Sequence, residues 1–418
     1  MARSSASVVP LLFPPRFLQW TGPLAAVAAA TLLIAVAVIW SGALNLAASV
    51  PHPQGWASIL HYTFKRSAAF HAAGLKPPAD ITSTALIEKG AVYYDRACAH
   101  CHSAPGRGQN PVALAMRPQP QYLPYVAADF TTPELFWIVK HGIKYSAMPA
   151  WPVQNRDDEV WALAAFVQRL PKMDGATYRA LTGTDLDTQA IPPFPPGAAR
   201  PVRYQPGIVT PDATEQRIER PALGFGAAGI DANVGRDCVA CHGLDGGGRP
   251  GGAFPNIALL TEGQIAKALN DYASGARASG FMQPVAVDLT PAQIAGLAHY
   301  YARQPKHPAD ALTPPADLLA LGARIASRGS GAERIGACAS CHEYTKAAQK
   351  AYPNINGQNW RYLRDQLKLF RSGIRGGASS INQMYGAARH LTDREIDAVA
   401  LFYASRPPGA PRPGPVTG

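Results

Sequence analysis

Six cysteines, all in three copies of the string Cys-x-x-Cys-His, constrain the fold of this 418-residue chain more than any other feature. The strings are Cys98, Cys101 and His102; Cys238, Cys241 and His242; and Cys338, Cys341 and His342. No cysteine is left for a structural disulfide, so the cysteines here serve cofactor attachment. Their recurrence predicts three repeated structural units, one around each string.

A methionine follows each string, 40 to 46 residues after the histidine, and we expect each in a loop: Met148, Met282 and Met384. An amphipathic helix is predicted after each methionine, over 158–170, 291–304 and 393–405. Two of these helices begin with a capping box, formed by Thr290 with Gln293 and by Thr392 with Glu395. The units therefore share one order: attachment string, methionine, closing helix.

Two cysteines separated by two residues lie on one helical turn, from which both sulfurs can bond to the vinyl groups of one haem. The adjacent histidine then lies under the iron. A single such string is also compatible with a zinc site or a dithiol redox site. A zinc site would need further Cys or His pairs at matching spacing, and a thioredoxin-like site would need a βαβ pattern; the sequence shows neither. We therefore predict three covalently bound haem c groups, each with its iron.

The iron of each haem needs a sixth ligand. Thioether sulfur is soft, so Met/His ligation favours the ferrous state and raises the reduction potential. Of the six methionines, Met1 is the start, Met116 lies only 14 residues after His102, and Met173 lies beyond the closing helix of its unit. Met148, Met282 and Met384 remain as the candidate sixth ligands; the alternative for each is a residue that fills the core.

The predicted fold class is all-α, with three helical domains in tandem after an N-terminal transmembrane helix. The expected divisions are 1–50 for a cytoplasmic N-terminus and anchor, 51–84 for a juxtamembrane segment, 85–172 for domain 1, 173–220 for a linker, 221–306 for domain 2, 307–410 for domain 3 and 411–418 for a tail. The linker contains a Pro- and Arg-rich stretch over 191–206, which favours extended chain.

From Pro23 to Trp40 the chain has 18 residues without charge, close to the ~20 that cross a bilayer. Arg3 and Arg16 precede this run, and no charged residue follows until Lys65. The positive-inside rule then places the N-terminus in the cytoplasm and the rest of the chain outside. The alternative is a cleaved signal peptide, since 47–49 forms an acceptable cleavage site. A short helix is expected over 56–72.

The net charge of +11 is concentrated at the C-terminal end, where 306–418 carries +7. This indicates an acidic partner or an anionic lipid surface and not nucleic acid, for which the sequence has no motif. Five basic residues at helical spacing form a basic stripe: Arg361, Arg364, Lys368, Arg371 and Arg375. Two interpretations remain open, a solvated helix face and a docking surface for an acidic redox partner or lipid headgroups.

Two arginines, Arg277 and Arg375, occupy equivalent places before the methionines of the second and third units. A guanidinium suits bidentate binding of a haem propionate. The alternative is that both side chains are simply solvated.

With these motifs the chain resembles class I cytochromes c over about 85–410. Residues 221–410 resemble the tandem dihaem cytochromes of bacteria, the c4 type, on the string Pro353-Asn354-Ile355-Asn356-Gly357-Gln358 with Leu363, Gln366, Leu367, Gly373 and Arg375. The second unit departs from this type, with Ala258-Leu259-Leu260 in place of Asn356-Gly357-Gln358. The first domain is similar to monohaem domains of membrane-anchored bacterial cytochromes. The resemblance implies ligation by His102/Met148, His242/Met282 and His342/Met384.

The expected function is electron transfer by a membrane-anchored trihaem cytochrome on the periplasmic side of a bacterial inner membrane. Its partners would be a quinol-oxidising complex or dehydrogenase as donor and a terminal oxidase or reductase as acceptor. An alternative is the cytochrome subunit of a periplasmic dehydrogenase complex. A haem peroxidase is a third possibility, against which the presence of one candidate methionine per haem argues, because peroxide chemistry needs an open iron site.

Overall fold

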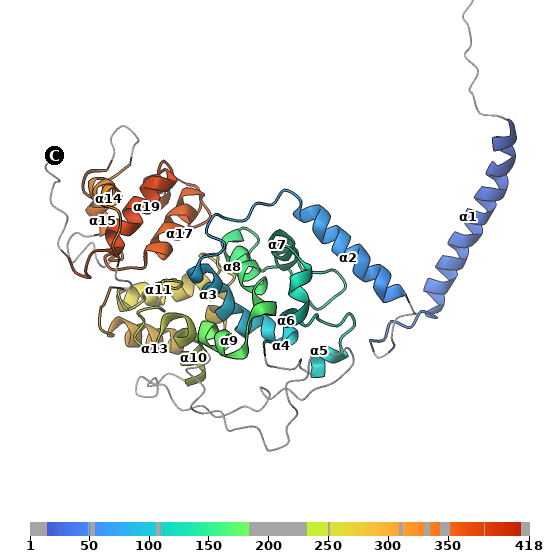
Figure 1. Cartoon of the computed structure of the whole chain (residues 1–418), viewed down its shortest axis with the longest axis horizontal. Coiled ribbons are helices and arrows are strands. Elements are labelled where there is room, and N and C mark those ends of the chain that lie inside the picture. Colours follow the sequence, from blue (N-terminus) through green and yellow to red (C-terminus); the bar gives the residue numbers. More distant parts are fainter. Residues whose placement is uncertain are drawn as a thin grey trace, which may run out of the picture. The chain divides into compact units, whose positions relative to one another are not determined.

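A computed structural model describes residues 15–48, 50, 55–105, 109, 111–183, 232–249, 251–308, 312–329, 335–342, 352–379 and 381–410. The chain divides into two compact units, Met1–Ser58 and Ile59–Gly418. Within the described ranges the regular elements are helices and no β-strand forms, which confirms the predicted all-α fold class (Figure 1). Most of the expected linker, from 184 to 220, and the tail 411–418 lie outside the described residues.

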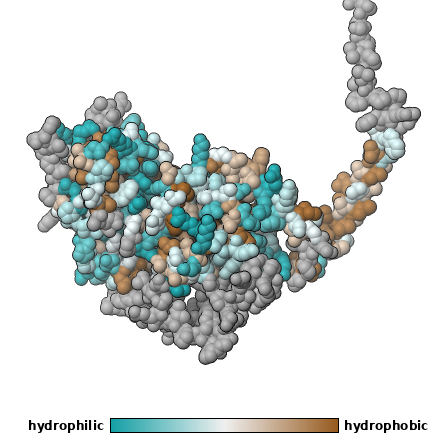
Figure 2. All heavy atoms as spheres, in the orientation of Figure 1, coloured by the Kyte–Doolittle hydropathy of each residue, from teal (hydrophilic) through white to brown (hydrophobic). Residues whose placement is uncertain are grey.

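The first unit contains helix α1 (Pro15–Ser41). Its segment Trp20–Ser41 has 22 residues, a mean hydropathy of 2.4 and no buried residue. Apolar side chains follow this helix along its exposed length (Figure 2). By length and composition α1 can cross a bilayer, although an N-terminal signal sequence has the same properties.

The second unit contains three helical bundles, each with its own apolar core. Bundle 1 consists of α3 (Thr84–Tyr93), the π-helix η1 (Tyr94–Cys98), α4 (Ala99–His102), α5 (Pro111–Ala115), α6 (Leu123–Val126), η2 (Ala127–Asp129), α7 (Thr132–His141), α8 (Asp157–Val167), η3 (Leu170–Lys172) and α9 (Gly175–Thr182). Its core contains the rings of Tyr94, Phe166 and Tyr178, which contact one another. Helix α2 (Trp56–Ala72), expected from the sequence, adds the buried Ala68 to this core.

Bundles 2 and 3 repeat a smaller set of helices. Bundle 2 consists of α10 (Ala232–His242), α11 (Glu262–Ala273), α12 (Met282–Val287) and α13 (Pro291–Ala302). Bundle 3 consists of α14 (Ala316–Arg328), α15 (Ala339–His342), α17 (Trp360–Arg371), α18 (Gln383–Ala388) and α19 (Asp393–Ala404). The equivalent residues Tyr301 and Tyr403 are fully buried in the two cores. The three predicted closing helices correspond to α8, α13 and α19, and both predicted capping boxes form.

Two local expectations differ from the structure. Residues 175–182, expected at the start of an extended linker, form α9, because Asp174 caps this helix and Tyr178 is buried with its hydroxyl donating to Asp95 at 2.6 Å. Met282 and Met384 were expected in loops but lie in the first turns of the short helices α12 and α18. These helices are too short for periodicity to reveal them.

Glycine permits the closest helix crossings in bundles 1 and 3. A Cβ atom on Gly90 of α3 would lie 2.1 Å from the carbonyl oxygen of Ala162 on α8. In the same way, a Cβ on Gly322 of α14 would lie 2.2 Å from the carbonyl oxygen of Ala398 on α19. Helices α3 and α8 in bundle 1, and α14 and α19 in bundle 3, therefore touch backbone to backbone.

Gly322→Ala is expected to destabilise bundle 3 by ~1–3 kcal/mol, the usual cost of overpacking, because neither helix backbone can give way. The matched control is Gly263→Ala on the exposed face of α11, where nothing lies within 4 Å of the added methyl group. Alanine there should be neutral or stabilise by up to ~1 kcal/mol. Hydrogen exchange of peptides from α14 and α19 measures the difference; equal protection in both variants would refute this account of the crossing.

Candidate functional site

Each Cys-x-x-Cys-His string lies on a helix of its own bundle. The first string runs from the end of η1 into α4, the second ends α10, and the third runs into α15. All six cysteines are half-buried, and none forms a disulfide. Residues i and i+3 of a helix share one face, so the two sulfurs of each pair point to the same side. This matches the separation that attachment to one haem requires.

The three histidines share one hydrogen-bond pattern, which tests whether the strings fit a haem. Nδ1 of His102 lies 2.7 Å from the carbonyl oxygen of Gln121, and Nδ1 of His242 and His342 lies 3.1 Å and 2.9 Å from the carbonyl oxygens of Pro255 and Pro353. A carbonyl can only accept, so Nδ1 carries the proton and donates. Burial lowers the pKa of all three imidazoles, which leaves Nε2 with a free lone pair. A neutral imidazole with its other nitrogen anchored is the form that ligates iron.

Met148 lies in a tight loop after α7. The N–H of Met148 donates to Ser146 Oγ at 3.1 Å, and its carbonyl oxygen accepts from Ile143 N–H at 3.1 Å. Gly142 has φ +65°, and a Cβ there would lie 2.5 Å from the backbone of Pro149. Met148 and Cys98 both pack against the core of bundle 1. The backbone around Met148 is thus fixed on both sides.

Met282 and Met384 are held at the starts of short helices by polar caps. Ser279 Oγ accepts from the N–H of Met282 at 3.1 Å. Asn382 Oδ1 accepts from Tyr385 N–H at 3.2 Å, while its amide donates to the carbonyl oxygens of Arg375 and Gly377. All three candidate methionines are half-buried.

Bundles 2 and 3 are joined by a reciprocal pair of hydrogen bonds. Gln358 accepts from the backbone N–H of Asn256 and donates to its carbonyl oxygen, both at 2.8 Å. Gln358 and Asn256 are both buried. Asn256 and Gln358 therefore lie at the junction between the two bundles.

Arg277 and Arg375 meet in the same region, one from each bundle. Both donate to Gln366 Oε1, and Arg277 also donates to the hydroxyl of Tyr362 at 2.9 Å. Burial and the charge of Arg277 lower the pKa of Arg375 to about 10. Burial alone would raise the pKa of Tyr362, but the two arginines lower it to about 8. Among the described ion pairs neither guanidinium has a carboxylate partner, which fits a site for anionic propionates.

Sequence reasoning missed Tyr362 at this junction. It lies four residues before Gln366 and therefore on the same face of α17, which is the signal that could have identified it.

Four residues of the basic stripe lie on α17, Arg375 lies four residues beyond its end, and the stripe makes contacts within the protein. Arg364 pairs with Asp80 at 2.7 Å and Asp365 at 3.0 Å, and Arg371 and Lys368 pair with Asp393 at 2.6 and 3.8 Å. Arg361 donates to the carbonyl oxygen of Gly251, and the half-buried Arg375 donates to Gln366. The partners of these basic residues could not be predicted from the sequence, because some are distant along the chain: Arg364 and Asp80 are 284 residues apart.

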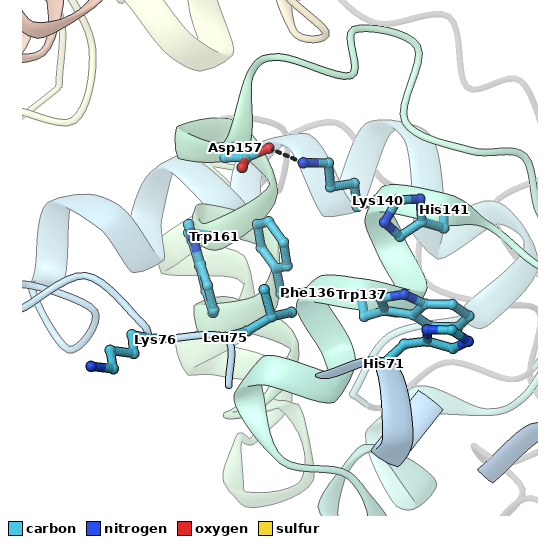
Figure 3. A pocket seen from close by; sticks show the side chains of 9 residues that line it. All are labelled: His71, Leu75, Lys76, Phe136, Trp137, Lys140, His141, Asp157 and Trp161. Carbon is cyan, nitrogen blue, oxygen red and sulfur yellow. Dashed lines mark hydrogen bonds and ion pairs between the residues drawn. The ribbon is translucent and has the colours of Figure 1, made fainter. Parts of the chain in front are cut away.

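A cavity of about 360 Å³ lies in bundle 1 beside α2 (Figure 3). Its residues are His71, Leu75, Lys76, Phe136, Trp137, Lys140, His141, Asp157 and Trp161. The ring of His71 stacks on Trp137 with centroids 5.2 Å apart, and Lys140 pairs with Asp157 at 2.6 Å. None of the twelve candidate haem-binding residues lines this cavity. The stacked rings of His71 and Trp137 hold α2 against α7.

Two family models match the chain. The model described as "Cytochrome C oxidase, cbb3-type, subunit III" matches residues 85–167. The model described as "Cytochrome c" matches residues 232–302 and 322–406. Each match contains one attachment string and one candidate methionine. Covalent haem c is therefore the cofactor of these domains.

Relatives are found among bacterial electron-transfer proteins. The thiosulfate dehydrogenase electron acceptor of Thiomonas intermedia is 34% identical over 171 residues, which cover 41% of this chain and 78% of the relative. Cytochrome c4 of Thiocapsa roseopersicina is 32% identical over 185 residues, which cover 44% of this chain and 93% of the relative. A structure of thiosulfate dehydrogenase from Marichromatium purpuratum is 31% identical with a TM-score of 0.37, covering 44% of this chain and 38% of that chain. The chain therefore belongs to the class I c-type cytochromes, is an electron-transfer protein and contains a c4-like dihaem segment.

Proposed function

We propose that the chain is a membrane-anchored trihaem cytochrome that carries electrons on the periplasmic side. Its donor would be a dehydrogenase or a quinol-oxidising complex, and its acceptor a terminal oxidase or reductase. The haem domains would span 85–172, 221–306 and 307–410. The observation that carries the proposal is the same anchored, neutral imidazole in all three bundles, each followed by one methionine.

Each side chain has a defined role in this proposal. Haem c, when bound, takes up and releases one electron at a time. Cys98, Cys101, Cys238, Cys241, Cys338 and Cys341 would hold the three haems covalently. His102 with Met148, His242 with Met282 and His342 with Met384 would bind the irons, and the sulfur ligands would favour the reduced state. Arg277 and Arg375 would neutralise propionates between bundles 2 and 3.

The experiment that tests the carrier role uses the purified full chain with its haems. Three haems should reduce and reoxidise reversibly in a redox titration, each with absorbance in the methionine–iron charge-transfer band. Turnover of hydrogen peroxide at a high rate by the same preparation would instead establish a peroxidase.

A second candidate, the cytochrome subunit of a periplasmic dehydrogenase complex, is favoured by the relative named as a thiosulfate dehydrogenase electron acceptor. The two candidates differ in their assembly. Gentle solubilisation of membranes followed by co-purification should recover a stoichiometric dehydrogenase if the chain is a subunit, and a respiratory complex or no fixed partner if it is a mobile carrier.

The anchor makes a separate prediction. If α1 stays in the membrane, the full chain should remain in the membrane pellet after a carbonate wash, since an apolar helix of this length is not displaced by salt or alkali. Mass spectrometry should detect peptides from 17–65 in that pellet. Release of a shorter chain that begins after residue 49 would instead establish a cleaved signal peptide.

A further inference from the structure

Glu159, in the first turn of α8, is a fully buried carboxylate that joins bundle 1 to bundle 2. From bundle 2, Ser279 Oγ donates to Oε1 at 2.6 Å and Gly280 N–H donates to Oε2 at 2.6 Å. From bundle 1, Arg156 lies 2.9 Å from Oε1, and the indole N–H of Trp151 donates to Oε2 at 3.3 Å. Four donors, two from each bundle, thus satisfy one carboxylate that has no exposed surface.

Arg156 extends this contact to a third residue of bundle 2. Its guanidinium donates to the carbonyl oxygen of Ala278 at 2.7 Å and forms a two-pronged pair with Asp158 at 2.8 Å. We call the set of Arg156, Glu159 and 278–280 the docking contact. Removing one partner from a buried, charged network of this kind leaves other charges without compensation, so the docking contact is costly to open.

The docking contact lies directly before Met282. Ser279 Oγ, which donates to Glu159, also accepts from the backbone N–H groups of Phe281 and Met282, at 3.2 and 3.1 Å. A single hydroxyl therefore couples Glu159 of bundle 1 to the backbone of the proposed iron ligand of bundle 2.

Aromatic rings fill the space beside the docking contact. Phe281 packs against Tyr93 and Trp151, with ring centroids 4.6 and 5.7 Å apart. Trp151 follows Met148 by three residues, and Tyr93 precedes Cys98 by five. Segments next to the proposed haem ligands of both bundles therefore meet at one ring cluster.

Gly280 packs so closely against bundle 1 that no side chain fits at this position. A Cβ atom on Gly280 would lie 2.4 Å from the buried indole of Trp151. At a second point Arg249 of bundle 2 pairs with Glu88 at 2.9 Å and donates to the carbonyl oxygens of Ala180 and Leu181 at 2.9 Å. At a third point Arg96 of η1 pairs with Asp237 of α10, so bundles 1 and 2 are joined by ion pairs or hydrogen bonds at three places.

We propose that this junction is the route by which electrons pass between bundle 1 and bundle 2, with Glu159 as the positioning residue that holds the Met282 segment against the aromatic rings of bundle 1. One electron leaves the reduced centre of bundle 1 and the oxidised centre of bundle 2 gains it; no bond forms or breaks and no proton moves. This inference rests on the proposed trihaem carrier function.

Two variants of the full haem-loaded chain test the inference. Glu159→Gln keeps the shape but offers one acceptor oxygen to four donors and turns an amide N–H₂ toward some of them. Gly280→Ala keeps every charge and adds one methyl group against Trp151. Glu395→Gln is the control for the first, since it lies in a capping box where Gln264 and Gln293 serve at the equivalent position in α11 and α13. Gly263→Ala is the control for the second.

Hydrogen exchange of the 278–284 peptide should rise by at least about tenfold in both variants as the contact opens, and stay unchanged in the controls. After pulse reduction of one haem per chain, electron redistribution between bundles 1 and 2 should slow by a similar factor in both variants and keep the rate of the unmodified chain in both controls.

Unchanged exchange in both variants would overturn the docking role of Glu159. Faster exchange with an unchanged rate between bundles 1 and 2 would overturn the electron route while the carrier function stands. Absence of any redistribution in the unmodified chain would instead overturn the proposed function itself.

Discussion

Replacing Met148 with alanine is expected to lower the midpoint potential of the haem in bundle 1 by a few tenths of a volt, within the ~0.8 V range over which axial ligands tune haem. The loss follows because soft thioether sulfur stabilises ferrous iron, and no other described methionine of bundle 1 is held by a loop of this kind. A redox titration of the full chain measures the shift. The charge-transfer absorbance should lose one of its three contributions.

Met116→Ala and Met173→Ala are the controls for this experiment. Met173 packs against the core of bundle 1, so its variant should be less stable but keep all three potentials. Should the Met148 variant retain the full charge-transfer absorbance and Met173→Ala lose part of it, the assignment of the sixth ligand in bundle 1 would be reversed.

Replacing both cysteines of one string with alanine is expected to remove one haem from each chain, because the two thioether bonds are its only covalent links. The Cys98/Cys101, Cys238/Cys241 and Cys338/Cys341 double variants should each carry two haems. Intact mass spectrometry under denaturing conditions counts the haems that remain attached, and the pyridine haemochrome absorbance per chain should fall by about a third in each variant.

Ser340→Ala is the matched control within a string, since Ala240 occupies the equivalent place in the second one. It should keep three haems. An unmodified chain with fewer than three haems, or a double variant that still carries three, would contradict the assignment of one haem to each string.

The sequence alone was sufficient for the features that depend on neighbours along the chain. The three strings, the closing helices α8, α13 and α19, and the capping boxes at Thr290 and Thr392 all follow from local spacing and helical period. Short helices could not be predicted from the sequence alone. Helices α9, α12 and α18 span eight residues or fewer, so their apolar pattern is no longer than one or two turns.

The contacts between bundles could not be predicted, because they join residues about a hundred positions apart. By sequence, Glu159 is the third acidic residue in a helix N-terminus, where a solvated charge that favours the helix dipole is the ordinary expectation. Its burial depends on Ser279 and Gly280, 120 and 121 residues away. The acidic partners of the basic stripe were likewise not predicted, because periodicity identifies a helix face but not the carboxylates that pair with it.

The contact between Gln358 and Asn256 constrains the amino acid at one of the two positions and not at the other. Across the junction the Gln358 side chain bonds to the backbone N–H and carbonyl of residue 256, and its Oε1 also accepts from the N–H of the adjacent Asn359. Every amino acid except proline supplies both groups at that position. At 358, by contrast, the residue must carry a donor and an acceptor on a side chain of this length. Sequence change is therefore restrained on one side of this contact only, since the Asn256 side chain bonds elsewhere, to the N–H of Ala258 and the carbonyl oxygen of His307.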